Sequence, residues 1–176
     1  MDREKAALWA LERFLDLLAT IPRKRMWRFA EVAGKLWYRL DKRHRRIALD
    51  NLAMAYGDEL TRARREEIAR GVFDHLARVI FELPYLRTLS LENLDEFITF
   101  SGVENSDAAL RKNKGLLVMT THFGNWEMMA LGFSMKHHPF NVVVRPLDNA
   151  VLDKAITDLR SRGGNRMIPK SESVKE

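Results

Sequence analysis

The sequence predicts a mixed α/β fold, in which amphipathic helices precede a βαβαβ unit of a mostly parallel sheet. Two observations support this prediction. Apolar residues recur every three or four positions through the first 46 residues, which is the period of a helix with one apolar face. From residue 106 onward, short apolar runs alternate with helical stretches, which is typical of parallel strands joined by crossover helices. We therefore expect helices at 1–46 and part of an α/β domain at 47–176.

The first 46 residues hold two amphipathic segments. Leu8, Leu11 and Leu15 share one face of a helix that Pro22 ends, and the apolar positions of residues 26–40 repeat the pattern. The net charge of +6 lies entirely in the first 50 residues, which hold 13 Lys or Arg and 7 Asp or Glu. A basic, amphipathic terminus indicates contact with an anionic surface, either a membrane or a nucleic acid.

Two interpretations of these segments stay open, and both can hold together. They are core helices whose basic face is solvated, or they lie on a membrane with Trp9, Trp27 and Trp37 among the lipid headgroups. The stretch 6–22 contains three charged residues, so we expect it to lie on a bilayer rather than to span it. Tryptophans on apolar helix faces do not form stacking platforms for bases, so we expect no nucleic-acid partner.

The middle of the chain predicts two further helices. Thr61 caps the first, whose apolar positions run through residues 68–80 and which we expect to stop before Pro84. Ser106 is the expected cap of the second, a short helix that reaches Lys112.

Three short apolar runs predict buried strands: residues 116–121, 141–146 and 166–169. A helical stretch at 128–135 separates the first two. Asp148 or Asn149 caps the helix that separates the second and third, and Gly163-Gly164 ends it. This order of strands and helices completes the predicted βαβαβ unit.

A histidine and a glutamate lie where the first predicted strand ends, which is where open α/β sheets place their sites. His122 follows that strand, and Glu127 comes five residues later. Five steps along one helix would separate the side chains by about 140°, so the pair requires His122 on a loop that turns at Gly124. Glu127 would then fix the tautomer of His122, whose free ring nitrogen would act as a base. The structural alternative is a loop histidine beside a glutamate that stabilises a helix start.

Other chemistry is excluded or disfavoured. The sequence has no Cys, which excludes disulfides, thiolate metal ligands and a cysteine nucleophile. Ser134 lacks the sharp turn of a nucleophilic serine, which favours direct attack by an acceptor hydroxyl over a covalent acyl-enzyme. The adjacent His137 and His138 do not easily face one metal ion. We expect neither a metal nor a cofactor.

The strings THFGNWE and VVVRPLDNAVLDKAITDLRSRGG resemble the late acyltransferases of lipid A biosynthesis, within the lysophospholipid acyltransferase superfamily. The family motif of a histidine, four residues and an acidic residue matches His122 and Glu127. The Arg-Pro that follows the next strand matches Arg145-Pro146, and the arginine pair before glycine matches Arg160 and Arg162. The segment 45–52 is similar to the family's N-terminal half.

The resemblance implies an O-acyltransferase that moves a fatty acyl chain from an acyl carrier protein thioester to a hydroxyl of a lipid A precursor. His122 would be the base, and Glu127 would orient it. Arg145 and Arg160 would hold the developing charge or a phosphate, and Asn125 would contact the substrate. The implied place of action is the cytoplasmic face of the bacterial inner membrane. The alternative is a non-catalytic fragment that binds the membrane surface.

The resemblance also implies that these 176 residues are the N-terminal portion of such an enzyme. Family members continue with further strands, an Asp-Gln turn and a Phe-Phe-Gly segment, which this sequence lacks. Three strands would leave a parallel sheet short and open at an edge. We therefore expect the chain alone to transfer acyl groups poorly or not at all.

Overall fold

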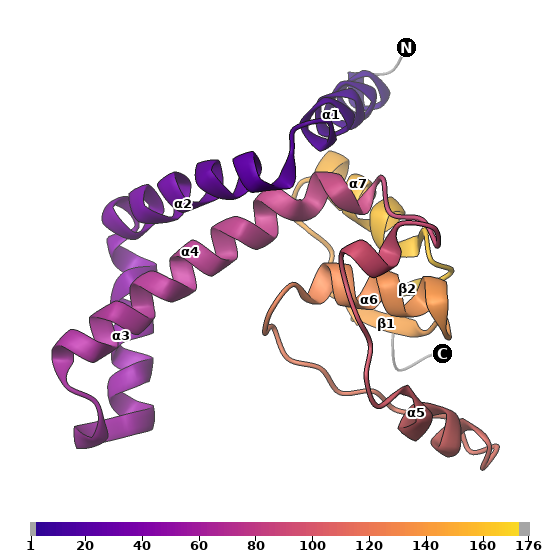
Figure 1. Ribbon diagram of the computed structural model, residues 1–176. Coiled ribbons are helices and arrows are strands. Elements are labelled where there is room, and N and C mark those ends of the chain that lie inside the picture. The colour runs from indigo at the N-terminus through magenta and orange to yellow at the C-terminus, as the bar shows by residue number, and fades with distance from the viewer. Residues whose placement is uncertain (1–2, 173–176) are drawn as a thin grey trace. The chain divides into compact units, whose positions relative to one another are not determined.

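The computed structural model describes residues 3–172, which form two compact units (Figure 1). The residues up to Asp16, together with those from Tyr85 onward, form one unit, and Leu17–Pro84 form the other. Helices α1 (Arg3–Ala19) and α4 (Arg62–Leu86) each contribute to both units. No helix in the described residues is long and apolar enough to cross a membrane.

The unit formed by Leu17–Pro84 is helical. It contains α2 (Arg23–Leu40), α3 (Lys42–Tyr56), the short 3₁₀ helix η1 (Gly57–Glu59) and most of α4. Asp41 separates α2 from α3 and caps α3 by accepting a hydrogen bond of 3.0 Å from the His44 amide. Thr61 caps α4 as predicted, because its hydroxyl accepts from the Arg64 amide at 3.3 Å.

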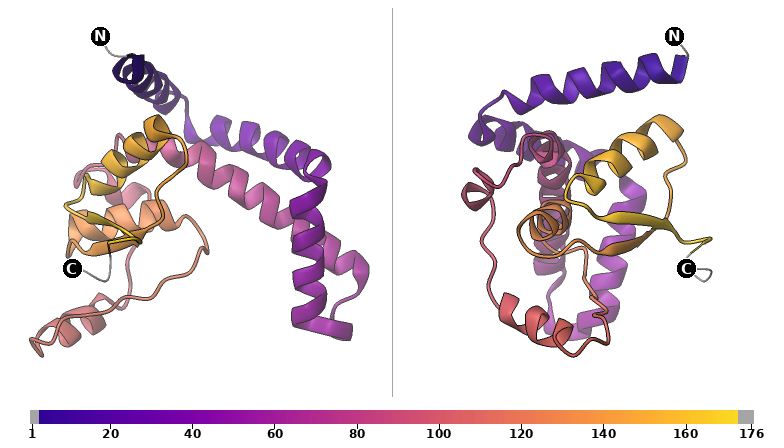
Figure 2. Two further views of the ribbon diagram at one scale, coloured as in Figure 1. Left: turned by 180° about the vertical axis from the view of Figure 1, so that it is seen from behind. Right: turned by 90° about the vertical axis from the view of Figure 1, so that its right-hand side faces the viewer.

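Helix α2 packs against α4, which lies beside it in both views of Figure 2. The buried face of α2 consists of Met26, Ala30 and Gly34. Phe73 of α4 is buried, and its ring lies edge-on at 5.4 Å from the ring of Trp37 and from that of Tyr38. The sequence therefore predicted the amphipathic character of α2 correctly, and one face of this helix belongs to a protein core.

The other unit is mixed α/β. In chain order it contains η2 (Leu94–Glu96), α5 (Val103–Leu110), α6 (Trp126–Lys136), β1 (Asn141–Val144), α7 (Ala150–Ser161) and β2 (Arg166–Pro169). The two strands are parallel, with Asn141 opposite Arg166 and Val144 opposite Pro169, and α7 connects them (Figure 2). The core of this unit is a cluster of six buried residues: Leu86, Leu89, Leu94, Met128, Leu131 and Leu159.

The predicted strands at 141–146 and 166–169 form as β1 and β2, but the predicted strand at 116–121 is wrong. Those residues have no secondary structure, and the side chains of Leu117 and Met119 are 96% and 95% exposed. An apolar run becomes a strand only where a neighbouring backbone pairs with it and a core covers its side chains. Residues 116–121 have neither, so the structure contains a βαβ unit rather than βαβαβ.

Two predicted helix boundaries are also wrong. Helix α4 continues through Pro84 to Leu86, because burial of Pro84, Tyr85 and Leu86 outweighs the loss of one helical hydrogen bond. Helix α5 begins before Ser106, at Val103, and ends at Leu110. Ser106 therefore lies inside the helix, where its hydroxyl donates to the Val103 carbonyl at 2.7 Å.

Candidate active site

The candidate site is centred on the first turn of α6. Gly124, with a φ of 65°, turns the chain into this helix, and Asn125 caps it by accepting from the Met128 amide at 3.0 Å. Glu127 lies in the first turn, where the partial positive charge of the helix N-terminus stabilises a carboxylate. The sequence thus folds locally into a turn that presents Glu127 at a fixed place.

An arginine from the following helix holds Glu127. Arg160 of α7 donates from Nε to one carboxylate oxygen at 2.9 Å and from a terminal nitrogen to the other at 2.5 Å. The side chains are 31% and 11% exposed, so this bidentate pair is largely shielded from water. These hydrogen bonds raise the pKa of Arg160 above its ordinary value, although partial burial opposes the shift. The pair joins α6 to α7.

The ring of Trp126 completes the environment of the carboxylate. Its Nε1 donates to Glu127 at 3.1 Å, and its ring meets the His122 ring edge-on, with centroids 4.8 Å apart. Trp126 therefore contacts both members of the predicted dyad. No local sequence pattern assigned it this position, although it is part of the string that carries the family resemblance.

His122 itself lies outside the Glu127–Arg160 pair. It is exposed, in a segment from residue 111 to 123 that is exposed throughout. In the described residues no hydrogen bond joins His122 to Glu127. The Glu127 carboxylate binds Arg160 instead, and the His122 ring contacts the ring of Trp126. The role of His122 as a base and that of Glu127 as its orienting group stay predictions.

The other predicted site residues lie in different surroundings. Asn125 is engaged as the cap of α6. Arg145 follows β1, is 85% exposed, and reaches Asp148 at 3.9 Å, a separation that leaves its guanidinium accessible to a ligand. Arg160 uses two of its three nitrogens on Glu127. Substrate binding by these three residues stays a prediction.

A buried asparagine supports the site, and sequence reasoning missed it. Asn165 is 4% exposed and lies between α7 and β2. Its oxygen accepts from the Phe140 amide at 3.1 Å, and its nitrogen donates to the carbonyls of Ala130 and Arg160 at 3.3 and 3.4 Å. Asn165 thus ties the end of the Arg160 helix to α6 and to the start of β1.

The second arginine of the matched pair has a structural role. Arg162 donates to the carbonyl of Leu86, the last residue of α4, and to that of Leu89. Burial lowers the pKa of Arg162, and the nearby charge of Arg87 lowers it further. The next residue, Gly163, packs directly against α6. A Cβ atom at this position would lie 2.0 Å from the Ser134 hydroxyl. Ser134 is buried and donates to the Leu131 carbonyl of its own helix.

The chain matches the family described as bacterial lipid A biosynthesis acyltransferase over residues 3–176. It belongs to that family. A curated relative from Haemophilus influenzae, named lipid A biosynthesis acyltransferase, is 25% identical over 170 residues. That alignment covers 96% of this chain and 52% of the relative, so the chain spans about half the length of the curated relative. No solved structure matches this chain significantly.

Membership of the lipid A acyltransferase family confirms the resemblance that the His122 motif and the Arg145-Pro146 strand end suggested. Within the described residues, no group of three or more His, Asp or Glu side chains is placed to hold a metal ion. The predicted site residues comprise an exposed imidazole, a carboxylate fixed by an arginine, and an exposed guanidinium.

Proposed function

We propose that this chain takes part in acyl transfer of lipid A biosynthesis, moving a fatty acyl chain from an acyl carrier protein thioester to a hydroxyl of a lipid A precursor. The observation that carries the proposal is the match to the lipid A acyltransferase family over residues 3–176, and within that match Arg160 fixes Glu127 at the start of α6. A carboxylate held in this way keeps its place when a substrate enters.

In the proposed reaction His122 removes the proton of the acceptor hydroxyl, and the hydroxyl oxygen attacks the thioester carbonyl carbon. A carbon–oxygen bond forms and the carbon–sulfur bond breaks, and the thiolate takes the proton from His122. The exposed guanidinium of Arg145 is the candidate for holding a substrate phosphate or the developing oxyanion. Because Arg160 is hydrogen-bonded to Glu127, its main proposed role is to position that carboxylate.

Glu127 can still accept a hydrogen bond from His122 in this scheme. Two carboxylate oxygens offer about four acceptor sites, and Arg160 and Trp126 account for three hydrogen bonds. Gly124, between His122 and the helix, has the backbone freedom to bring the imidazole toward the remaining site. The carboxylate would then stabilise the imidazolium that forms as the proton moves.

The proposal is tested with radiolabelled acyl–acyl carrier protein and a lipid A precursor. Three proteins are compared: the chain alone, the chain joined to the remaining half of a relative, and the joined protein with His122→Ala. We expect turnover in the joined protein and a loss of about 10²–10⁴-fold on removal of the base. Undiminished transfer by the His122→Ala protein would overturn the assignment of His122.

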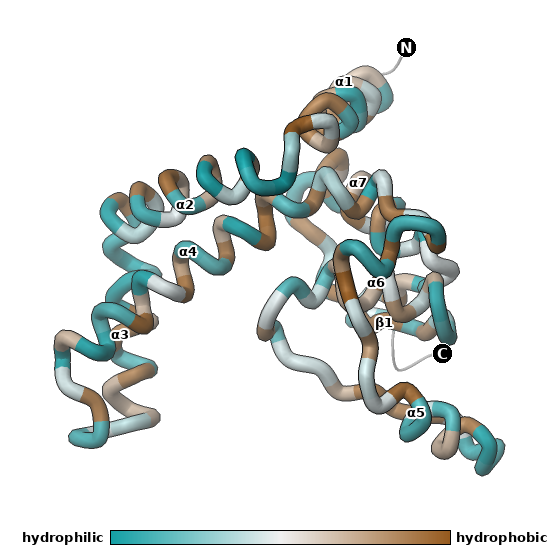
Figure 3. Tube along the Cα trace, viewed as in Figure 1, coloured by the Kyte–Doolittle hydropathy of each residue, from teal (hydrophilic) through white to brown (hydrophobic). Residues whose placement is uncertain are grey.

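The proposed place of action is the cytoplasmic surface of a bacterial inner membrane, reached through the first two helices. Figure 3 shows hydrophobic and hydrophilic residues interspersed along both α1 and α2. Four apolar residues of α2 at helical spacing are each more than half exposed: Phe29, Val32, Leu36 and Leu40. Exposed basic residues accompany them: Arg25, Arg28, Lys35 and Arg39. An apolar stripe with cations on its flanks suits an anionic membrane surface.

The second candidate function is membrane-surface binding without catalysis. The observation that favours it is the same stripe, because an exposed apolar helix face suits a lipid surface whether or not the chain carries out chemistry. The two candidates differ in acyl transfer and not in membrane binding, so both activities have to be measured on one preparation.

A further inference from the structure

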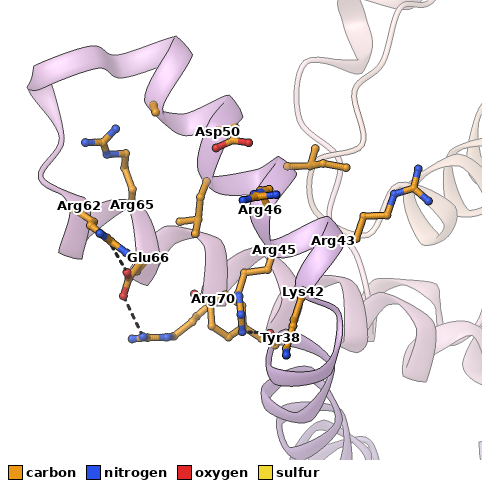
Figure 4. Close-up of a pocket in the computed structure, with 13 residues that line it drawn as sticks. Tyr38, Lys42, Arg43, Arg45, Arg46, Asp50, Arg62, Arg65, Glu66 and Arg70 are labelled. Atoms are coloured by element: carbon orange, nitrogen blue, oxygen red, sulfur yellow. Dashed lines mark hydrogen bonds and ion pairs between the residues drawn. The ribbon is translucent and has the colours of Figure 1, made fainter.

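A groove with a volume of about 1100 Å³ lies between α3 and α4, and its lining is strongly basic (Figure 4). Seven of the thirteen lining residues are Lys or Arg, and two are acidic, Asp50 and Glu66. The basic residues come from both helices: Lys42, Arg43, Arg45, Arg46, Arg62, Arg65 and Arg70. Cations gathered along one groove give it a positive potential, which attracts anions.

The groove's own carboxylates do not neutralise these cations. Glu66 is shared between Arg62 and Arg70, each at 3.4 Å, and Arg62 is 90% exposed. Arg45 donates to the Tyr38 carbonyl at 3.1 Å and lies over the Tyr38 ring. In the described part of the chain no hydrogen bond or ion pair engages four of the cations: Lys42, Arg43, Arg46 and Arg65.

One of these cations is buried at the atom that needs an acceptor. The Nε of Arg65 has no accessible surface and no hydrogen-bond partner. Buried N–H groups in folded proteins almost always find an acceptor, because leaving a charged donor unsatisfied is costly. Because the Nε is closed to solvent, an oxyanion bound in the groove would meet Arg65 through the terminal nitrogens of its guanidinium. Arginine suits phosphate best, since its planar fork binds two oxygens at once.

An open apolar surface lies at the corner between α2 and α3, in the same helical unit as the basic groove. It is formed by Ala33, Leu36, Trp37, Leu40 and Asp41. Leu40 and Asp41 are close in sequence to Tyr38 and Lys42, which line the basic groove. Leu36 and Leu40 are 53% and 71% exposed. A free phosphate ion or an acidic protein would leave this apolar surface open to water, whereas a lipid would cover it.

We propose that the groove between α3 and α4 binds the phosphate of an anionic membrane phospholipid, while the exposed apolar residues of α2 contact the bilayer to which that lipid belongs. Arg46 of α3 and Arg65 of α4 line the groove without a side-chain partner in the described residues, so each is a candidate to bind the phosphate. This inference deepens the membrane contact proposed above and rests on it. It gives the membrane contact a separate site for the lipid headgroup, and the residues of this site are not those proposed for acyl transfer.

The test uses a short-chain lipid dissolved as monomers, so that its result is independent of vesicle binding and of acyl transfer. Calorimetric titration of the full chain with dihexanoyl-phosphatidylglycerol should give saturable binding, and the zwitterionic dihexanoyl-phosphatidylcholine should bind more weakly. The variant Arg46→Gln/Arg65→Gln should lose about tenfold or more in affinity, because each charged hydrogen bond contributes about that factor.

Two further variants separate a phosphate site from general positive charge and from misfolding. Arg46→Lys/Arg65→Lys keeps both charges but loses the bidentate forks, and it should also bind several-fold more weakly. Arg111→Gln/Lys112→Gln removes two charges from an exposed segment outside the groove and should change the affinity less than about twofold. Far-UV circular dichroism confirms that each variant keeps its helices.

Several outcomes would overturn the proposal. Equal affinity for the two lipids, or unchanged affinity in the Gln variant, would remove the site. Binding of glycerol 3-phosphate as tight as that of phosphatidylglycerol would assign the groove to a free phosphate. Groove variants that keep phosphatidylglycerol binding but lose binding to an acyl carrier protein would assign it to an acidic protein.

Discussion

At the scale of residues, Glu127 is the best-defined group of the candidate site. Its two oxygens accept from Arg160 and Trp126, and it stands at a helix N-terminus that Asn125 caps. These hydrogen bonds fix the orientation of the carboxylate between α6 and α7. A carboxylate held in one orientation is suited to orient a neighbouring imidazole.

The Glu127–Arg160 pair should matter for stability as well as for the site. Arg160→Ala leaves the shielded Glu127 carboxylate without its main partner, so we expect the free energy of unfolding to fall by about 2 kcal/mol. Urea unfolding followed by circular dichroism measures this change.

Lys154→Ala on the same helix is the matched control for Arg160→Ala. Lys154 pairs with Asp158 at 2.9 Å, but the two side chains are 60% and 50% exposed. Its loss should therefore change the free energy of unfolding much less than Arg160→Ala does, because water screens an exposed ion pair. Equal losses in the two variants would show that the Glu127–Arg160 pair contributes no more than a surface ion pair.

The sequence suggested candidate residues for the site but not which of them meet. Glu127 and Arg160 are 33 positions apart, and their contact depends on how α6 and α7 pack. A local pattern linked Glu127 instead to His122, five residues away. Asn165 could not be recognised at all, because an asparagine after a helix is usually a turn residue, and only burial against Ala130 and Phe140 gives it a structural role.

At the scale of elements, the close approach of α2 and α4 depends on a glycine. A Cβ atom on Gly34 would lie 2.7 Å from the Asp74 backbone, which cannot move without shifting α4. Gly34→Ala should therefore lower the free energy of unfolding by about 1–3 kcal/mol, as overpacking does. Thermal or urea unfolding of the full chain measures the loss.

Gly71→Ala is the control for this substitution. Gly71 lies inside α4 with nothing within 4 Å of the position of a Cβ atom. Alanine there should raise the free energy of unfolding by about 0.5–1 kcal/mol, because it favours the helix and meets no neighbour. A stabilising effect of both substitutions would contradict the close contact between α2 and α4.

Elements were predictable where a strong local signal agreed with tertiary packing. The valines of β1 and the Asn149 cap of α7 are such cases, since Asn149 accepts from the amides of Val151 and Leu152 at 3.0 Å each. The run 116–121 carries an equally apolar signal, but no strand pairs with it in the described residues. Periodicity describes a segment, whereas a strand also requires a partner.

At the scale of the whole molecule, the excess positive charge lies in the N-terminal part of the chain, and exposed apolar residues accompany it there. The excess of basic residues lies within the first 50 residues, and α1 has no fully buried residue. Trp9 and Phe14 of α1 are 59% and 55% exposed, and the outer stripe of α2 is exposed too. Single exposed apolar residues are ordinary, but two successive helices that carry them beside cations favour a membrane surface.

We therefore expect the full chain to float with vesicles that contain phosphatidylglycerol and to bind neutral phosphatidylcholine vesicles more weakly. Added salt should weaken the binding to anionic vesicles, because it screens the attraction between exposed charges. Leu36→Asp, which places a carboxylate in the stripe of α2, should reduce flotation with both kinds of vesicle. Leu91→Asp, at an equally exposed leucine outside that stripe, is the control.

Acyl transfer is measured on the same preparation to separate the two candidate functions. Flotation together with transfer by the joined protein would support the enzyme, whereas flotation without any transfer would favour a membrane-binding protein that lacks the chemistry. Equal, salt-independent binding to both kinds of vesicle would contradict the membrane contact itself. In that case the basic faces of α1 and α2 would be solvated faces of ordinary helices, which is the simpler of the two interpretations that the sequence allowed.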